Sequence, residues 1–312
     1  MTSKSVSPFS SPTRLLSRLT RLTSTIPGLD ASLMLAQYSS PLVIALLLRL
    51  ASFQARYPRL TLAVGGKSSP GGFGLVKLAE GWGRAAGSIS DARVIMRAFG
   101  LLPIIQWLLG LHPRPLASLR SFLLSLGNSK GFQSEKTLPT LQALSLLAYY
   151  PLEHISWLAS KGVVPLTPAS LNMTALWSVR FWALYVILEI YKMRNTYLGL
   201  LGRTRALKNA NSEITPSEAE GFELQDTNAT SNISAEKVVV HPPTGNVAIK
   251  VQQIKKDWAS WKMAVMVNSG YAPLTVHWST PGGLWSSPLI TGSLGTVVAL
   301  GQLVTEWRKG DP

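Results

Sequence analysis

The chain has no cysteine and few charged residues. Among its 312 residues, charged side chains make up 14%, and 15 Asp and Glu stand against 30 Lys and Arg. The absence of cysteine excludes disulfides, thiolate nucleophiles and cysteine-ligated zinc or iron–sulfur sites. A typical soluble domain has about 25% charged residues. The shortage of charge, with 46% hydrophobic residues and a mean hydropathy of +0.19, therefore indicates a membrane-associated protein.

The few acidic residues are unevenly distributed. Six of the fifteen lie between residues 209 and 243: Glu213, Glu218, Glu220, Glu223, Asp226 and Glu236. We interpret this stretch as an acidic disordered loop. The rest of the chain is strongly basic, and such a surface attracts nucleic acid or anionic lipid. The apolar composition favours lipid, and no basic–aromatic groove or finger motif predicts nucleic-acid binding.

An adjacent glutamate and histidine lie in the aromatic stretch AYYPLEHISWLASKG. We expect a helix to begin at Pro151, which makes Glu153 a polar anchor in its first turn. His154 is then rotated by about 100° from Glu153, so the two do not converge on one ligand or substrate. The remaining histidines, His112, His241 and His277, show no ligand spacing. We therefore expect no enzymatic activity, no cofactor and no metal site.

The N-terminal extension, residues 1–28, is rich in Ser and Arg. Its segment TRLLSRLTRLTST forms an amphipathic helix when wound at about 100° per residue, and we expect Pro27-Gly28 to end it. One face holds Arg14, Arg18 and Arg21, and the other holds Leu15, Leu16, Leu19 and Leu22. This pattern is typical of docking on a membrane surface. A mitochondrial presequence and an ordinary solvated helix face are the alternatives.

Residues 29–208 are predicted to be a helical membrane-associated region. Ala31–Tyr57 fits a packed helix, and VGGKSSPGGFG (64–74) fits a loop that lacks the phosphate-loop spacing. Gly74–Leu111 fits a helix that is bent or ended by Pro103, and its Arg93 and Arg97 lie one turn apart. A lipid-inserting helix and a bundle helix with one wet face are both open here.

A long helix should run from Pro168 to Lys208, capped by Thr167. Arg180 and Glu189 lie near its apolar centre. Charges are costly in hydrocarbon, so we expect this helix to be buried in a bundle or at an interface.

Residues 244–312 should contain the C-terminal helices. A helix over Val247–Ser269 is followed by an expected loop or re-entrant segment, Tyr271–Pro288. Residues 287–305 form the best candidate for a transmembrane helix, with a buried bundle helix as the alternative. Its small residues Gly292, Gly295 and Ala299 suit close packing. The predicted fold class is all-α, a membrane-associated helical bundle with amphipathic helices and a C-terminal transmembrane helix.

The stretch AYYPLEHISWLASKGVVPL resembles the central signature of the peroxin-11 family of peroxisomal membrane proteins. The residues that carry it are Tyr149, Tyr150, Leu152, Glu153, His154, Trp157, Leu158, Lys161 and Gly162. Three further segments resemble the family in the same order: Arg84–Leu109, Trp177–Arg194 and Val265–Trp307. The N-terminal extension, the acidic loop and Pro103 depart from the family pattern and suggest a divergent, fungal-like branch.

The resemblance implies a non-enzymatic role at the peroxisomal membrane in peroxisome proliferation and division. An amphipathic helix is expected to insert into one leaflet, and the resemblance implies homo-oligomers or a paralogue and the organelle fission machinery as partners. Anionic lipid is the expected ligand of six arginines: Arg14, Arg18, Arg21, Arg84, Arg93 and Arg97. The chain ends Gly310-Asp311-Pro312 rather than Ser-Lys-Leu, so we expect a membrane-type address.

Two alternative functions stay open. One is a channel or small-solute transporter of the peroxisomal or mitochondrial membrane, supported by Arg180 and Glu189 within apolar sequence. The other is a mitochondrial membrane protein, which rests on the Arg/Ser-rich N-terminus.

Overall fold

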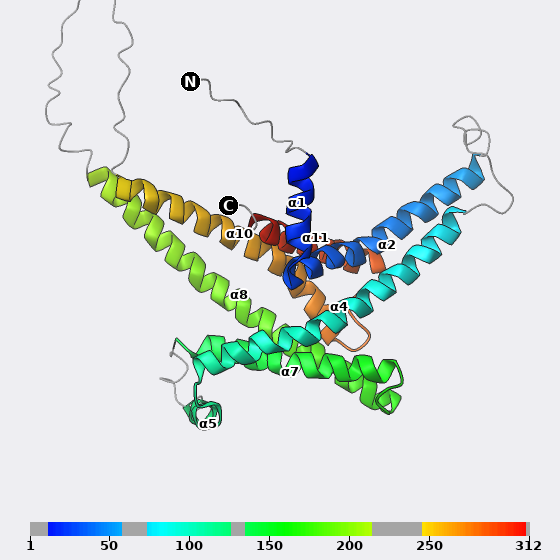
Figure 1. Ribbon diagram of the computed structural model, residues 1–312, viewed down its shortest axis with the longest axis horizontal. Helices are drawn as coiled ribbons and strands as arrows, with labels where there is room; N and C mark the ends of the chain where they lie inside the picture. Colours follow the sequence, from blue (N-terminus) through cyan, green and yellow to red (C-terminus); the bar gives the residue numbers. More distant parts are fainter. Residues whose placement is uncertain (1–11, 58–73, 126–134, 214–244, 310–312) are drawn as a thin grey trace, which may run out of the picture. The chain divides into compact units, whose positions relative to one another are not determined.

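A computed structural model describes residues 12–57, 74–125, 135–213 and 245–309, which form eight helices and no strand (Figure 1). The all-α prediction is therefore confirmed. The helices are α1 (Pro12–Thr23), α2 (Ile26–Arg56), α4 (Leu75–Leu111), α5 (Pro115–Ser125), α7 (Thr137–Ser160), α8 (Pro168–Glu213), α10 (Gly245–Ser279) and α11 (Pro288–Lys309). The predicted loop at 64–74, except for residue 74, and most of the predicted acidic loop lie outside the described residues.

Side-chain caps and a glycine turn define several helix ends. The Thr167 hydroxyl accepts a hydrogen bond from the Ser170 N–H at 3.2 Å, so the predicted cap of α8 is confirmed. Thr25 caps α2 in the same way through the Gly28 N–H, at 3.2 Å. Pro27 consequently lies in the first turn of α2, and the expectation that it ends the preceding helix was wrong. Gly162 follows α7 with a φ of 76°, a backbone conformation that favours glycine.

In the part of the chain that the structure describes, four prolines lie inside helices, where the sequence predicted a helix start at Pro151, a loop at Pro273 and a bend or an end at Pro103. They are Pro41, Pro103, Pro151 and Pro273. Pro103 does not end α4, Pro151 lies within α7 rather than at its start, and α10 continues past Pro273 to Ser279. The predicted loop at 271–288 thus shrinks to residues 280–287. Proline removes one backbone hydrogen bond, and helices in apolar surroundings tolerate the loss because neighbouring helices and Ser or Thr side chains can satisfy the freed backbone group.

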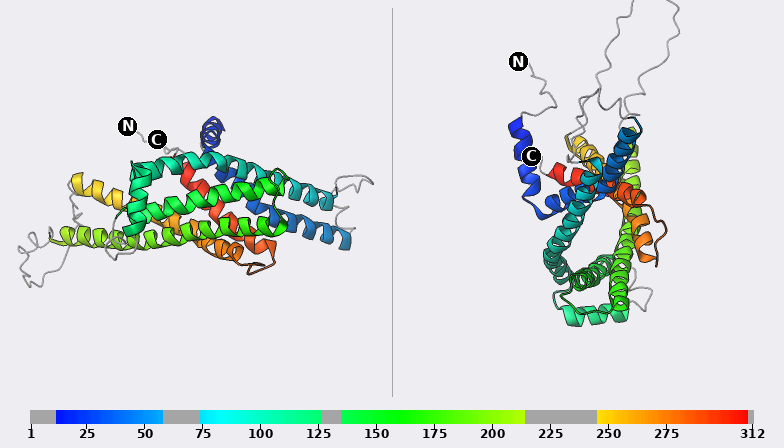
Figure 2. Two further views of the ribbon diagram at one scale, coloured as in Figure 1. Left: turned by 90° about the horizontal axis from the view of Figure 1, so that it is seen from below. Right: turned by 90° about the vertical axis from the view of Figure 1, so that its right-hand side faces the viewer.

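The chain divides into two compact units. The first contains residues 1–190 and 265–312, and the second contains residues 191–264. Within the first unit, α2 packs against both α4 and α11, and α4 also packs against α7 (Figure 1 and Figure 2). Met34, Val298 and Ala299 form a buried core between α2 and α11. Helix α4, in contact with two neighbours, is the element that positions the site described below.

Small residues bring α2, α10 and α11 into close contact. A Cβ added to Gly292 would lie 3.0 Å from the Tyr38 carbonyl oxygen of α2, and one added to Gly295 would overlap the Tyr38 ring. On α10, a Cβ on Gly270 would lie 2.8 Å from the Leu294 carbonyl oxygen of α11. Ala299 is fully buried in the core. The residues predicted for transmembrane packing therefore lie where helix backbones approach one another.

Among the residues that the structure describes, four helices are long and apolar enough to cross a membrane: Ile26–Arg56, Leu75–Leu111, Pro168–Asn209 and Pro288–Lys309. The sequence singled out only residues 287–305 as the best candidate span. It favoured a packed bundle for Ala31–Tyr57 and a bundle or an interface for Pro168–Lys208, and it left a lipid-inserting helix and a bundle helix open for Gly74–Leu111. Length and composition thus identify three further candidates. Together they support membrane association.

The glycine contacts generate a stability prediction. Replacing Gly295 by Ala should destabilise the fold by about 1–3 kcal/mol, because the added methyl group forces the Tyr38 ring to move. The thermal midpoint of the detergent-solubilised chain measures this effect. Gly87 of α4 is the matched control, since a Cβ there meets no atom within 4 Å. Gly87→Ala should be neutral or stabilising by up to about 1 kcal/mol, and equal losses for the two variants would contradict the contact.

Candidate functional site

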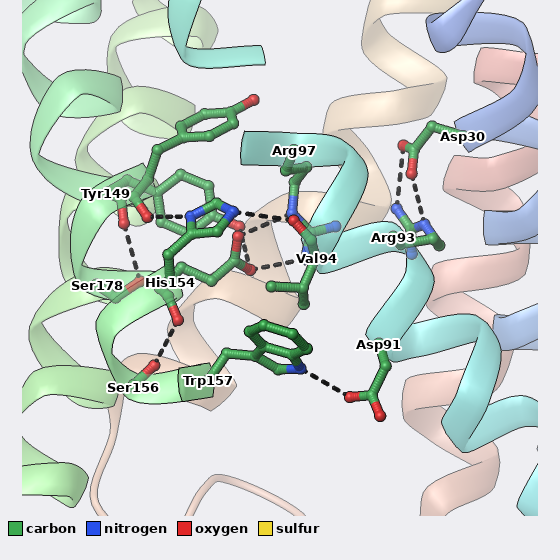
Figure 3. A network of polar contacts seen from close by, with 12 residues as sticks. Asp30, Asp91, Arg93, Val94, Arg97, Tyr149, His154, Ser156, Trp157 and Ser178 are labelled. Atoms are coloured by element: carbon green, nitrogen blue, oxygen red, sulfur yellow. Dashed lines mark hydrogen bonds and ion pairs between the residues drawn. The ribbon is translucent and has the colours of Figure 1, made fainter. Parts of the chain in front are cut away.

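The candidate site lies where α7 packs on α4, and Glu153 is its central group. The Arg97 guanidinium donates to both Glu153 carboxylate oxygens, from Nε at 2.8 Å and from a terminal nitrogen at 2.7 Å (Figure 3). The Tyr149 hydroxyl, one turn earlier on α7, donates to the same carboxylate at 2.8 Å. Burial raises the pKa of the Tyr149 hydroxyl well above its ordinary value, so it stays protonated and remains a donor.

Both ring nitrogens of His154 face backbone carbonyl oxygens. Nε2 lies 2.9 Å from the Val94 carbonyl oxygen of α4, and Nδ1 lies 2.6 Å from the Tyr150 carbonyl oxygen of its own helix. Both ring nitrogens therefore have protein partners, which fits a structural role. Among the residues that the structure describes, no group of three or more His, Asp or Glu forms a possible metal site.

Asp91 continues the same contact one turn before Val94. It accepts a hydrogen bond from the Trp157 indole N–H at 2.9 Å and from the Lys161 ammonium at 2.6 Å. Asp91, Val94 and Arg97 are spaced by three residues, so they share one face of α4. Four residues of the resembled signature, Glu153, His154, Trp157 and Lys161, thus bind a single stripe of α4.

The other signature residues have supporting positions. The Tyr150 ring lies over Gly100 of α4, where an added Cβ would approach it to 3.2 Å. The Leu158 carbonyl accepts the N–H of Val163 at 2.9 Å, closing the turn around Gly162. Leu152 is half-buried on α7. Glu153 lies near the end of α7 rather than in its first turn, because Pro151 is internal to the helix.

Arg93 faces the opposite neighbour of α4. Its guanidinium donates to both carboxylate oxygens of Asp30 on α2, at 2.8 and 3.2 Å, and to the Gln37 side-chain oxygen at 2.7 Å. The Arg93 side chain is only 7% exposed. The sequence predicted headgroup contacts for Arg93 and Arg97. The structure instead directs both guanidinium groups toward carboxylates of the protein.

The other four arginines predicted to bind lipid lie on α1 and α4. Arg14 and Arg21 of α1 and Arg84 of α4 are exposed. Arg18 is half-buried, and its guanidinium lies over the Trp307 ring of α11 at 4.7 Å from the centroid. Lipid binding by these four residues stays a prediction.

Sequence reasoning missed several polar partners between the helices. Asp30, Gln37 and Asp91 were not assigned a role as acceptors, and Gln142, which donates to Glu189 at 2.7 Å, was not assigned one either. For the two aspartates the missed signal was the rarity of acids, because an acid in a basic, apolar chain is expected to pair with a cation when buried.

A sequence model described as Peroxisomal biogenesis factor 11 (PEX11) matches residues 114–307. The matched part holds α7 with its Glu153 and His154, and it begins after α1, α2 and α4. Comparisons with curated proteins and with solved structures found no match.

The α4–α7 contact generates a prediction about Glu153. Glu153→Gln removes the charge that compensates Arg97. The pair is partly buried, so the free energy of unfolding should fall by about 2–4 kcal/mol, somewhat less than the loss of about 3–5 kcal/mol for a fully buried ion pair. Thermal unfolding in detergent followed by circular dichroism measures the loss. Asp91→Asn is the matched control, because the Lys161–Asp91 pair is far more exposed. A loss for Asp91→Asn as large as that for Glu153→Gln would contradict the central role of the Arg97 pair.

Proposed function

Because the chain belongs to the peroxisomal biogenesis factor 11 family, we propose that it promotes peroxisome proliferation and division by remodelling the peroxisomal membrane. The family consists of peroxisomal biogenesis factors, and its role in peroxisomal membrane biogenesis and proliferation extends to this chain. The long apolar helices support membrane association. The mechanism of remodelling is the part that we propose.

Helix α1 is the best-suited element for shallow insertion into one leaflet. Leu15, Leu16 and Leu19 are 42%, 66% and 44% exposed along one face, although they are large apolar side chains. Arg14 and Arg21 lie on the other face. A helix of 12 residues is about 18 Å long, too short for a hydrocarbon core of about 30 Å. It fits a position in the membrane interface, where apolar side chains enter the lipid and cations bind anionic headgroups.

The contact between Arg18 and Trp307 supports this placement. Trp307 lies in the last turn of α11, just before Arg308 and Lys309. Tryptophan and basic residues at the end of an apolar helix favour the membrane–water boundary. The cation–π contact therefore supports a position of α1 near the membrane–water boundary, where we propose that shallow insertion takes place.

Helix α4 suits shallow insertion into one leaflet less well than the resemblance implied. Its Arg93 and Arg97 are held by Asp30 and Glu153, so headgroup binding would have to break both ion pairs. Removing a carboxylate from a buried arginine is costly. We infer that α4 acts as the fixed support and that α1 supplies the inserting face.

The channel alternative rested on Arg180 and Glu189, two charges within apolar sequence. Glu189 accepts a hydrogen bond from Gln142, and the Arg180 guanidinium lies over the Trp177 ring at 5.1 Å. Both charges thus interact with neighbouring side chains. Homo-oligomers or a paralogue, and the fission machinery, stay predictions.

A double variant of α1 tests the inserting face. Leu16→Asp with Leu19→Asp should abolish the tubulation of anionic vesicles by the reconstituted full-length chain, because carboxylates are excluded from the headgroup–acyl boundary. Electron microscopy of the vesicles gives the readout. In cells, the same variant should reach peroxisomes but leave them unelongated.

The matched control adds two acids to exposed positions on the polar side of the same segment, Ser17→Asp with Ser24→Asp. This variant carries the same change in charge and should retain most of the tubulation. The proposal fails if the leucine variant tubulates vesicles as well as the unmodified chain does.

A further inference from the structure

The second unit contains a self-contained pair of helical segments, residues 191–209 of α8 and 249–264 of α10, which we term the basic helix pair. Its contact centre is aromatic, since the Tyr197 ring lies 5.8 Å from Trp258 and 5.2 Å from Trp261. The two indole N–H groups donate across the pair, to the Thr204 hydroxyl at 3.1 Å and to the Met193 carbonyl at 3.0 Å. These contacts fix which faces of the two segments point outward.

The charge of the basic helix pair is strongly positive. Its basic residues are Lys192, Arg194, Arg203, Arg205, Lys208, Lys250, Lys255, Lys256 and Lys262. Its only acid is Asp257, which pairs with Arg203 at 2.9 Å. The remaining cations therefore create a surface that attracts anions.

One outward face of α8 combines cations with exposed apolar side chains. Tyr191, Arg194, Leu198 and Arg205 are spaced by three, four and seven residues, which puts them within about 60° of one another around the helix. We term these four residues the α8 stripe. Tyr191 is 54% exposed and Leu198 is 50% exposed. Within the described residues, neither Arg194 nor Arg205 contacts a carboxylate.

We propose that the α8 stripe binds the headgroup region of an anionic bilayer. An acidic protein segment or a nucleic acid would neutralise the arginines but leave Tyr191 and Leu198 with no apolar surroundings. A bilayer surface accommodates both, because phosphates bind the guanidinium groups while the tyrosine and leucine enter the acyl boundary. The stripe also lies in the C-terminal part of a helix that is a candidate span over Pro168–Asn209.

This site is separate from the inserting face proposed for α1. The two proposals share the anionic bilayer as ligand, but they rest on different helices and different residues. Loss of tubulation in the α1 variants would leave the binding of the α8 stripe unchanged, so the two can fail independently.

A depth measurement tests the stripe. The natural chain lacks cysteine, so a nitroxide can be attached at one introduced site without background labelling. In full-length chains in nanodiscs with anionic lipid, a label on Leu198→Cys should be more accessible to oxygen than to a water-soluble nickel complex. In nanodiscs of neutral lipid the order should reverse. A label on Thr196→Cys, an exposed position on another face of the same turn, should stay in water in both.

Charge reversals identify the residues responsible. Arg194→Glu with Arg205→Glu should return the Leu198 label to water in anionic nanodiscs. Lys255→Glu with Lys256→Glu, which makes the same change in charge on α10, should leave the label in lipid. The proposal is overturned if the Leu198 label is in water in both anionic and neutral nanodiscs, or in lipid in both. It is also overturned if the charge reversals on α8 and on α10 change the accessibility of the label equally. A change in the accessibility of the Leu198 label when acidic protein or nucleic acid is added in the absence of lipid would also overturn the proposal.

Discussion

The arrangement of the first unit depends on the need of two poorly solvated arginines for carboxylate partners. Arg93 and Arg97 lie one turn apart on α4, and each is bound through two nitrogens, by Asp30 of α2 and by Glu153 of α7. An unpaired guanidinium in apolar surroundings is costly, whereas a paired one with additional hydrogen bonds is tolerated. The two pairs therefore fix the register of α4 against both neighbours, and the bonds from Trp157 and His154 extend the contact along the helix.

The same constraint divides the basic residues into two groups. Two arginines of α4 are paired with acids and become structural, whereas many other cations lie on exposed faces. Helix α1 and the basic helix pair both carry exposed cations, and both place exposed large apolar side chains beside them. A chain with 30 basic and 15 acidic residues cannot pair all its cations internally. Anionic lipid can supply the missing charge, which agrees with membership of a family of peroxisomal biogenesis factors.

The sequence predicted the helices better than their contacts. Apolar runs and the Thr167 cap located α8, and composition indicated the all-α class. The rule that proline ends helices failed at Pro273, and at Pro103 only the bend remains of the two predicted alternatives, because the rule describes helices in water, where backbone groups released by proline find solvent. Periodicity placed Arg93 and Arg97 correctly on neighbouring positions but could not show which helices lie beside them. Identifying Asp30 and Glu153 as their partners requires contacts between residues 56 and 63 positions apart.

A double-mutant cycle on Arg97 and Glu153 tests the central claim most directly. Arg97→Met, Glu153→Met and the double variant would be compared by their unfolding free energies in detergent. If the ion pair fixes α4, each single variant leaves a poorly solvated charge unpaired, and the double variant is more stable than either. Additive losses, with the double variant the least stable of the three, would contradict the account.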